Sequence, residues 1–235
     1  MIAFPDATDP AAISPTFAVW ATSWLAGDVP TDDFLDEARA GLYLADVHLW
    51  ATLREHLQGH PSYTGADDHL GLAPVRLVLG GAGHVSPLPD GFYVAGAPGA
   101  GLWRVTAGDI EHIDAPLPSV PPAAAGDALH CLGEATTRAS MMIENLGFRP
   151  LVAGPRWQQV DLPGPPVARD LPAGAPTRVL QLFARATSVE ATVAAAREQA
   201  GELSLDPLLV PLGAAVRAAY EAAVEATARA LFPRA

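Results

Sequence analysis

The sequence predicts an α+β fold in which helices flank an antiparallel sheet. Between residues 75 and 113, short runs alternate apolar and polar side chains with a period of two and are separated by Gly and Pro turns, a pattern typical of strands. On both sides of this block, apolar residues recur at spacings of three and four, as on one face of a helix. Half of the 235 residues are hydrophobic and 17% are charged, a balance typical of chains that bury a core.

The expected order of elements is α-βββ-α-ββ(β)-α, with extra helices at the N- and C-terminal ends. We interpret residues 1–235 as a single α+β domain. The stretch 115–126 holds four prolines and little apolar bulk, which predicts a linker. A subdivision of the domain would fall there, between an acidic N-terminal half and a near-neutral C-terminal half.

Two helices are predicted before the sheet. Ser14 followed by Pro15 is typical of an N-cap and the first helical position, and Gly27 is typical of a helix end. Thr31 begins a second helix, whose apolar spacing continues to residue 58 with Gly41 as the place of a bend.

The sheet is predicted as a meander of three strands with a fourth strand at its edge. The alternating runs are 75–79, 92–95 and 102–105, with 110–113 as the edge strand. A helix over 129–146 follows the linker.

Further strands are expected at 151–153, 157–162 and 179–184. The last is apolar on both faces apart from Gln181, which is typical of an interior strand. Thr187 and Glu190 then form a capping box that begins a helix. An Ala-rich helix over 207–232 completes the fold, and its small residues permit close packing within the chain or across a dimer.

Charge and composition exclude several classes of function. All 14 basic side chains are Arg, and a chain without Lys cannot form a lysine Schiff base or supply the lysine of a P-loop. The formal net charge is −12, whereas binding to nucleic acid draws on clustered basic side chains. We therefore expect no direct binding to nucleic acid.

The negative charge is concentrated in the N-terminal half. Residues 1–115 hold 15 acidic residues against four Arg, and residues 116–235 hold 11 against ten. This distribution is typical of a solvated acidic face, and it would also attract a protein partner with a basic surface. The candidate partner-binding residues are Asp32, Asp33, Asp36, Glu37 and Asp46.

The expected location is cytoplasmic. Cys131 is the only cysteine, so the chain cannot form an intrachain disulfide. The first residues lack the basic and apolar regions of a signal peptide. No apolar run reaches the ~18 residues of a membrane span, so we expect no membrane contact.

A cluster of His and Asp residues is the strongest candidate for a metal site. Four of the seven histidines lie between residues 48 and 69. His56 and His60 are four apart, the spacing that places two imidazoles on one helix face. The candidate ligands are His56, His60, Asp67 and His69, with Asp68 beside them. Gly59 and Pro61 place His60 beyond the helix end, so a structural role for His56 is the favoured interpretation.

Other patterns indicate structure more than chemistry. The glycine-rich run 80–84 is followed by prolines and not by a helix, so it lacks the helix N-terminus that would bind phosphate, and His84 remains a lone candidate for a general base. The run 96–101 is typical of a hairpin turn. Cys131 and His130 point about 100° apart on a helix, and we expect Cys131 to be buried. The tryptophans are expected in the core.

The expected strand Val179 to Ala184, followed by a helix start at Thr187-Ser188-Val189-Glu190, gives the end of the chain a recognisable order of elements. With the preceding elements, this order resembles the fold of the type III secretion chaperones and the related YbjN-like proteins over about three quarters of the chain. The resemblance implies an acidic homodimer that binds other proteins and has no catalytic residues.

We therefore predict a non-catalytic, chaperone-like or adaptor protein that binds another protein as a homodimer and uses no cofactor. The alternative is a metal-dependent hydrolase that uses the His/Asp cluster of residues 56–69. A small-ligand binder that uses the tryptophans is a third possibility.

Overall fold

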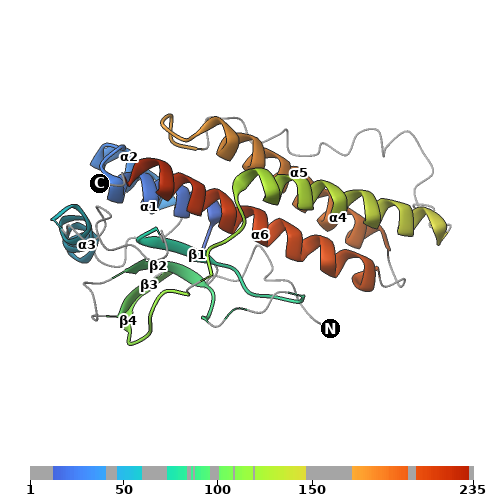
Figure 1. Ribbon diagram of the computed structural model, residues 1–235, viewed down its shortest axis with the longest axis horizontal. Coiled ribbons are helices and arrows are strands. Elements are labelled where there is room, and N and C mark those ends of the chain that lie inside the picture. Colours follow the sequence, from blue (N-terminus) through green and yellow to red (C-terminus); the bar gives the residue numbers. More distant parts are fainter. Residues whose placement is uncertain are drawn as a thin grey trace.

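The fold is known from a computed structural model of the chain (Figure 1). The structure describes residues 13–40, 47–59, 73–83, 86, 88–95, 101–107, 109–118, 120–146, 171–200 and 205–232.

These residues form six helices and one four-stranded antiparallel sheet, which confirms the α+β class. The helices before the sheet are α1 (Pro15–Ala26), α2 (Thr31–Ala40) and α3 (Val47–Gly59). The strands are β1 (Val75–Val78), β2 (Gly91–Ala95), β3 (Leu102–Thr106) and β4 (Asp109–Ile113). The helices after the sheet are α4 (Ala125–Asn145), α5 (Thr177–Ala200) and α6 (Asp206–Leu231).

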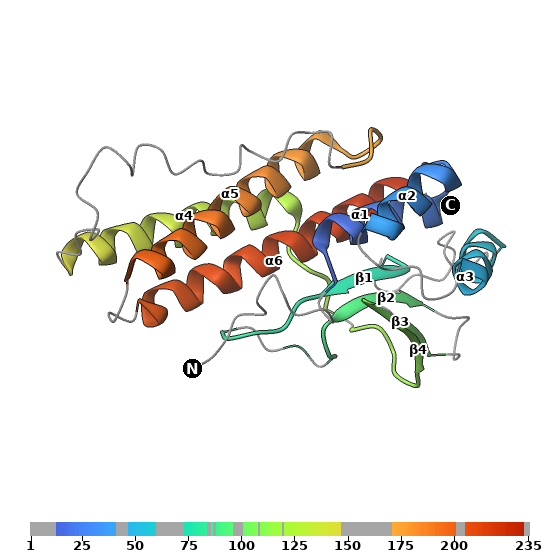
Figure 2. The ribbon, with the colours of Figure 1, turned by 180° about the vertical axis from the view of Figure 1, so that it is seen from behind.

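Helix α6 lies at the centre of the molecule. It packs against α4 and α5 in a three-helix bundle, and its C-terminal part packs against α1 and β1 (Figure 1). Figure 2 shows from behind that the sheet lies on one side of α6, whereas α4 and α5 lie on the other. Every layer of the fold therefore contacts α6.

Small side chains explain how α6 fits among so many neighbours. Ala219, Ala222, Ala223 and Ala228 are fully buried, and small residues let neighbouring helices approach closely. Leu212, Val216, Tyr220, Ala223 and Thr227, which follow one another at helical spacing, are also buried. The close packing foreseen for this helix occurs within the chain.

The sheet is the predicted meander, with its strands in the order β1-β2-β3-β4. Leu77 pairs with Phe92, Phe92 with Val105, and Val105 with Ile110, so these four side chains share one face. That face packs against the main core with the helices. The predicted edge strand is confirmed as β4.

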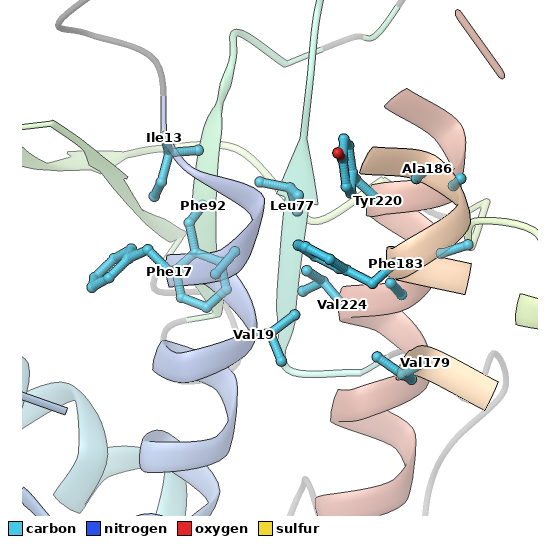
Figure 3. Close-up of a cluster of buried hydrophobic side chains, with 14 of the residues drawn as sticks. Ile13, Phe17, Val19, Leu77, Phe92, Val179, Phe183, Ala186, Tyr220 and Val224 are labelled. Carbon is cyan, nitrogen blue, oxygen red and sulfur yellow. The ribbon is translucent and has the colours of Figure 1, made fainter. Parts of the chain in front are cut away.

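The main core joins both sides of the linker that precedes α4. Figure 3 shows Phe17 of α1, with Leu77 and Phe92 of the sheet, beside Phe183 of α5 and Val224 of α6. All five side chains are buried in one cluster. The bundle and the sheet thus share a hydrophobic core.

An aromatic cluster fixes the first three helices on the sheet. Trp24 stacks on Phe34 with ring centroids 4.5 Å apart, and Trp50 meets Phe34 edge-on at 5.3 Å. Trp50 also lies 6.5 Å from Phe92 of β2. The expectation that tryptophans belong to the core is confirmed at Trp24 and Trp50, which are buried, and Trp20 and Trp103 pack partly buried against it. Trp157 lies outside the described residues.

The first helix has the predicted ends. Ser14 precedes Pro15 at the start of α1, and Gly27 ends the helix with a φ of 89°, the left-handed conformation that favours glycine. Helices α2 and α3 occupy the two ends of the range 31–58, over which one helix with a bend at Gly41 was expected. Residues 41–46, which include Gly41, lie outside the described residues.

The expected strand at 179–184 is also wrong. These residues belong to α5, which begins at Thr177 and runs through Thr187, so the expected helix start at Thr187 is a position inside the helix. The buried side chains Val179, Leu182, Phe183 and Ala186 follow helical spacing. A short run that is apolar on both faces fits a buried strand and a buried helix equally well. The expected strands at 151–153 and 157–162 lie outside the described residues.

Candidate functional site

Four charged side chains of α6 form a row along one side of the helix. Arg217, Glu221, Glu225 and Arg229 follow one another at intervals of four, and we call this row the charged stripe. Arg217 is 5% exposed and Glu225 is 2% exposed. These two charges therefore lie inside the protein, where a charge requires partners, whereas Glu221 is half-buried and Arg229 is exposed.

Glu225 is paired with a strand residue far away in the sequence. Its Oε2 lies 3.7 Å from Nη2 of Arg76 in β1, and both side chains are almost fully buried. Its Oε1 accepts a hydrogen bond of 2.8 Å from Nε of Arg229. Burial lowers the pKa of Arg76 and the charge of Glu225 raises it. A guanidinium is protonated at all accessible pH values, so Arg76 carries its charge into the interior.

The same arginine fastens the linker. Nη1 of Arg76 donates hydrogen bonds to the carbonyl oxygens of Pro118 at 3.0 Å and Val120 at 2.8 Å. One guanidinium thus joins β1, α6 and the segment that leads to α4. These contacts indicate a structural role for Arg76.

The other half of the stripe holds the end of β1 and the loop after it. Glu221 accepts a hydrogen bond of 2.8 Å from the backbone N–H of Leu79, and Arg217 donates one to the carbonyl oxygen of Ala82. Gly81 has a φ of +135°, and a Cβ at this position would lie 3.1 Å from the guanidinium of Arg217. The glycines of this run therefore give Arg217 room. No helix begins between β1 and β2 in the residues that are described there, in agreement with the interpretation against a phosphate loop.

Thr187 and Glu190, which were expected to cap a helix, instead bind the same phenol. The hydroxyl of Tyr220 in α6 donates to Oε2 of Glu190 at 2.7 Å and lies 3.1 Å from the hydroxyl oxygen of Thr187. Burial, followed by the nearby charge of Glu190, raises the pKa of Tyr220. The three side chains connect α5 to α6.

A second set of hydrogen-bonded polar side chains lies on the sheet face that points away from the helices. Tyr93 is fully buried and donates a hydrogen bond of 2.7 Å to the carbonyl oxygen of Pro89, and burial raises its pKa to about 12. Arg104 donates to the carbonyl oxygen of Asp90 through Nε at 2.8 Å and Nη2 at 2.6 Å. Its Nη1 lies 2.6 Å from Oε1 of Glu111. These groups bind other parts of the protein, which indicates a structural role.

The predicted metal site is mostly beyond what the structure describes. His60, Asp67, Asp68 and His69 lie outside the described residues, and so does His84. His56 belongs to α3, but the position of its side chain is not among those described. The residues that are described contain no group of three or more His, Cys, Asp or Glu that could hold a metal ion. The metal site stays a prediction.

Most of the predicted partner-binding acids lie on α2. Asp32, Asp33 and Asp36 are exposed, on the side of the helix opposite Phe34 and Ala38, which are buried.

We call the exposed side of α2 the acidic face. Asp36 pairs with Arg39 at 3.1 Å. Glu37 is half-buried, and Asp46 lies outside the described residues. The sequence thus located the acidic face, which the hydrophobic anchors of α2 turn toward solvent.

The expectation that Cys131 is buried is wrong. Cys131 is exposed on α4, because α4 packs against the bundle through a narrow row of small and apolar side chains. Its neighbour His130 lies 3.3 Å from Oε1 of Glu134, and both are exposed.

Helix α4 presents an apolar surface that sequence analysis missed. Ala128, Leu132 and Ala139 are buried against the bundle, whereas Met141, Met142 and Leu146 are 58%, 44% and 63% exposed. Both views show that the C-terminal end of α4 extends past the neighbouring ends of α5 and α6 (Figures 1 and 2). Leu146 continues the buried row of α4 but lies beyond the bundle. In the sequence, this exposure could have been recognised from Met141, an apolar residue that does not belong to the buried row.

Helix α6 is also long and apolar enough to cross a membrane, the only such helix in the part of the chain that is described. Of the apolar 18-residue segment of α6 that has this property, 56% is buried inside the protein. A central core helix passes the same test of length and composition. The expectation of no membrane contact therefore stays a prediction.

These features define a class of protein. It is an α+β chain in which a helix-covered antiparallel meander shares its core with a three-helix bundle, and in which α2 and α4 expose an acidic and an apolar surface.

Comparison with known families agrees with this two-part organisation along the chain. Residues 14–108 match the Rv1486c-like protein, N-terminal domain, and residues 126–221 match the Rv1486c-like protein, C-terminal domain. Together the two matches span most of the chain in this order, so the chain belongs to the Rv1486c-like family. No curated protein and no solved structure matches it.

The buried ion pair leads to a test by mutation. Glu225→Ala leaves the charge of Arg76 buried without its carboxylate, and we expect it to lower the free energy of unfolding by about 3–5 kcal/mol. The double variant Arg76→Met with Glu225→Leu removes both charges, so it should lose less than Glu225→Ala alone. Urea denaturation followed by tryptophan fluorescence measures both changes. A double variant that loses as much stability as Glu225→Ala, or more, would contradict the coupling.

Proposed function

We propose that this protein is a non-catalytic, chaperone-like or adaptor protein that binds another protein and acts as a homodimer. It would work in the cytoplasm and without a cofactor. The observation that carries the proposal is the exposure of three large apolar side chains in the C-terminal part of α4, with Met142 and Leu146 toward the side of the buried row and Met141 on the opposite side. Clustered exposed apolar side chains mark sites of interaction.

The chemistry of this surface suits protein binding. Methionine is flexible and polarizable, and it adapts to an apolar surface of varied shape. Two of the three exposed apolar side chains are Met141 and Met142. They lie on a helix that the bundle holds through Leu132 and Ala139, so the binding surface would be rigid in its backbone and adaptable in its side chains.

The buried polar groups support a non-catalytic role. Glu225, Tyr93 and Tyr220 hydrogen-bond or pair with other parts of the protein. Catalytic groups need to reach a substrate, whereas these three are buried where they connect one element to another.

The acidic face of α2 would bind a partner of opposite charge. Asp32, Asp33 and Asp36 are exposed on one side of a helix that Phe34 anchors in the core. The chain carries a formal net charge of −12, which strengthens the attraction of a basic surface. The partner we propose is therefore a protein with a basic surface.

Sedimentation and light scattering test the dimer. We expect a species of twice the 24.4 kDa of one chain at micromolar concentration, and Met141→Glu should shift it toward the monomer, because a charge in an apolar contact is costly. The control is Val120→Glu, since Val120 is 77% exposed and lies outside α4. A wild-type chain that stays monomeric at every concentration would refute the homodimer.

Salt dependence tests the acidic face. A variant that combines Asp32→Asn, Asp33→Asn and Asp36→Asn should retain less of the proteins that the wild-type chain captures from native extract at low salt. The same proteins should dissociate from the wild-type chain as the salt concentration rises, because screening weakens the attraction between surface charges. Captured proteins that are indifferent to both changes would show that the acidic face serves only solubility.

A further inference from the structure

We infer that the proposed homodimer forms by antiparallel packing of α4 against α4 of a second copy, with the two-fold axis at Met141. The inference rests on the proposed homodimer and goes beyond it by naming the residues that meet. Its basis is the pattern of exposed side chains along α4.

Three side chains at intervals of three define the contact. Arg138, Met141 and Glu144 are exposed. At 100° per residue, Met141 points away from the buried Leu132 and Ala139, and Arg138 and Glu144 lie about 60° to either side of it. The row has an apolar residue at its centre, a positive charge three residues before it and a negative charge three residues after it.

A two-fold axis at Met141 makes this row complementary to itself. In an antiparallel pair, the residue three positions before the axis faces the residue three positions after it on the other helix. Arg138 of each copy then faces Glu144 of the other, and the two Met141 side chains meet between the two ion pairs. Thr137 and Asn145, both exposed and polar, face each other in the same way.

The charges also select the direction of the helices. In a parallel pair related by a two-fold axis, Arg138 would face Arg138 and Glu144 would face Glu144, and like charges in contact are unfavourable. Only the antiparallel arrangement pairs opposite charges across the axis.

Neither charge is engaged within the described part of the chain. Glu134, which is four residues before Arg138, lies against His130. In the part of the chain that the structure describes, Arg138 and Glu144 form no ion pair, so both are available to a second copy.

The contact would be of modest size. One helix from each copy buries less than the about 1,200 Å² at which stable interfaces begin. We therefore expect a dimer that dissociates on dilution, with ion pairs that matter more for register and direction than for affinity.

Charge reversal tests the register. Arg138→Glu places two glutamates against two glutamates, and Glu144→Arg places arginines against arginines, so each should weaken dimerisation by about tenfold or more in sedimentation equilibrium. The double variant Arg138→Glu with Glu144→Arg restores opposite pairs and should recover the wild-type dissociation constant. Arg185→Glu, an equal reversal at an exposed position of α5, is the matched control. Circular dichroism checks that each variant is folded.

A disulfide tests the axis itself. In a Cys131→Ser background, Met141→Cys places two thiols at the two-fold axis, where oxidation should link the copies into a covalent dimer. The native Cys131 lies ten residues away, about 15 Å along the helix, so its two copies would be about 30 Å apart. The wild-type chain should therefore form no disulfide-linked dimer under the same conditions.

The outcomes separate the inference from the proposed function. A wild-type dimer that ignores both single reversals, or one that Met141→Cys fails to cross-link, overturns the α4 pairing and leaves the homodimer standing. A monomeric wild-type chain overturns both. Weakened single variants that the double variant does not rescue also refute the proposed register.

Discussion

The charged stripe of α6 holds the two parts of the fold together. Glu225 pairs with Arg76 of β1 at 3.7 Å, and Glu221 accepts from the backbone at the end of the same strand. A strand at the edge of a sheet exposes backbone groups that pair readily with other chains, and α6 satisfies part of that edge at Leu79. The apolar residues between the charges bury α6 in the bundle, so one helix serves both layers.

Burial of α6 decides where interactions with other proteins take place. Because its sides are occupied by α1, α4, α5 and β1, the helices at the periphery present the surfaces that remain. Helix α2 is anchored by Phe34 and turns its acids outward, and α4 is packed through Leu132 and Ala139 and turns Met141 outward. The proposed functions of α2 and α4 thus follow from the position of α6.

The sequence predicted those features that local spacing determines. Alternation located the four strands, and the cap at Gly27 located the end of α1, since both depend on neighbouring residues. The run 179–184 was predicted as a strand and belongs to α5, because a short run that is apolar on both faces fits a buried strand and a buried helix equally well. The partner of Glu225 is Arg76, and no local pattern links positions so far apart. The exposure of Leu146 depends on where α5 and α6 end, which spacing along α4 does not reveal.

The central claim is that α6 makes the sheet and the bundle one cooperative unit. Native-state hydrogen exchange in low denaturant tests it most directly, because it measures the free energy of opening at individual amides. Amides in the middle of β1, β2 and α6 should exchange with the same opening free energy, equal to that of global unfolding. Sheet amides that open with a markedly lower free energy than those of α6 would contradict the account.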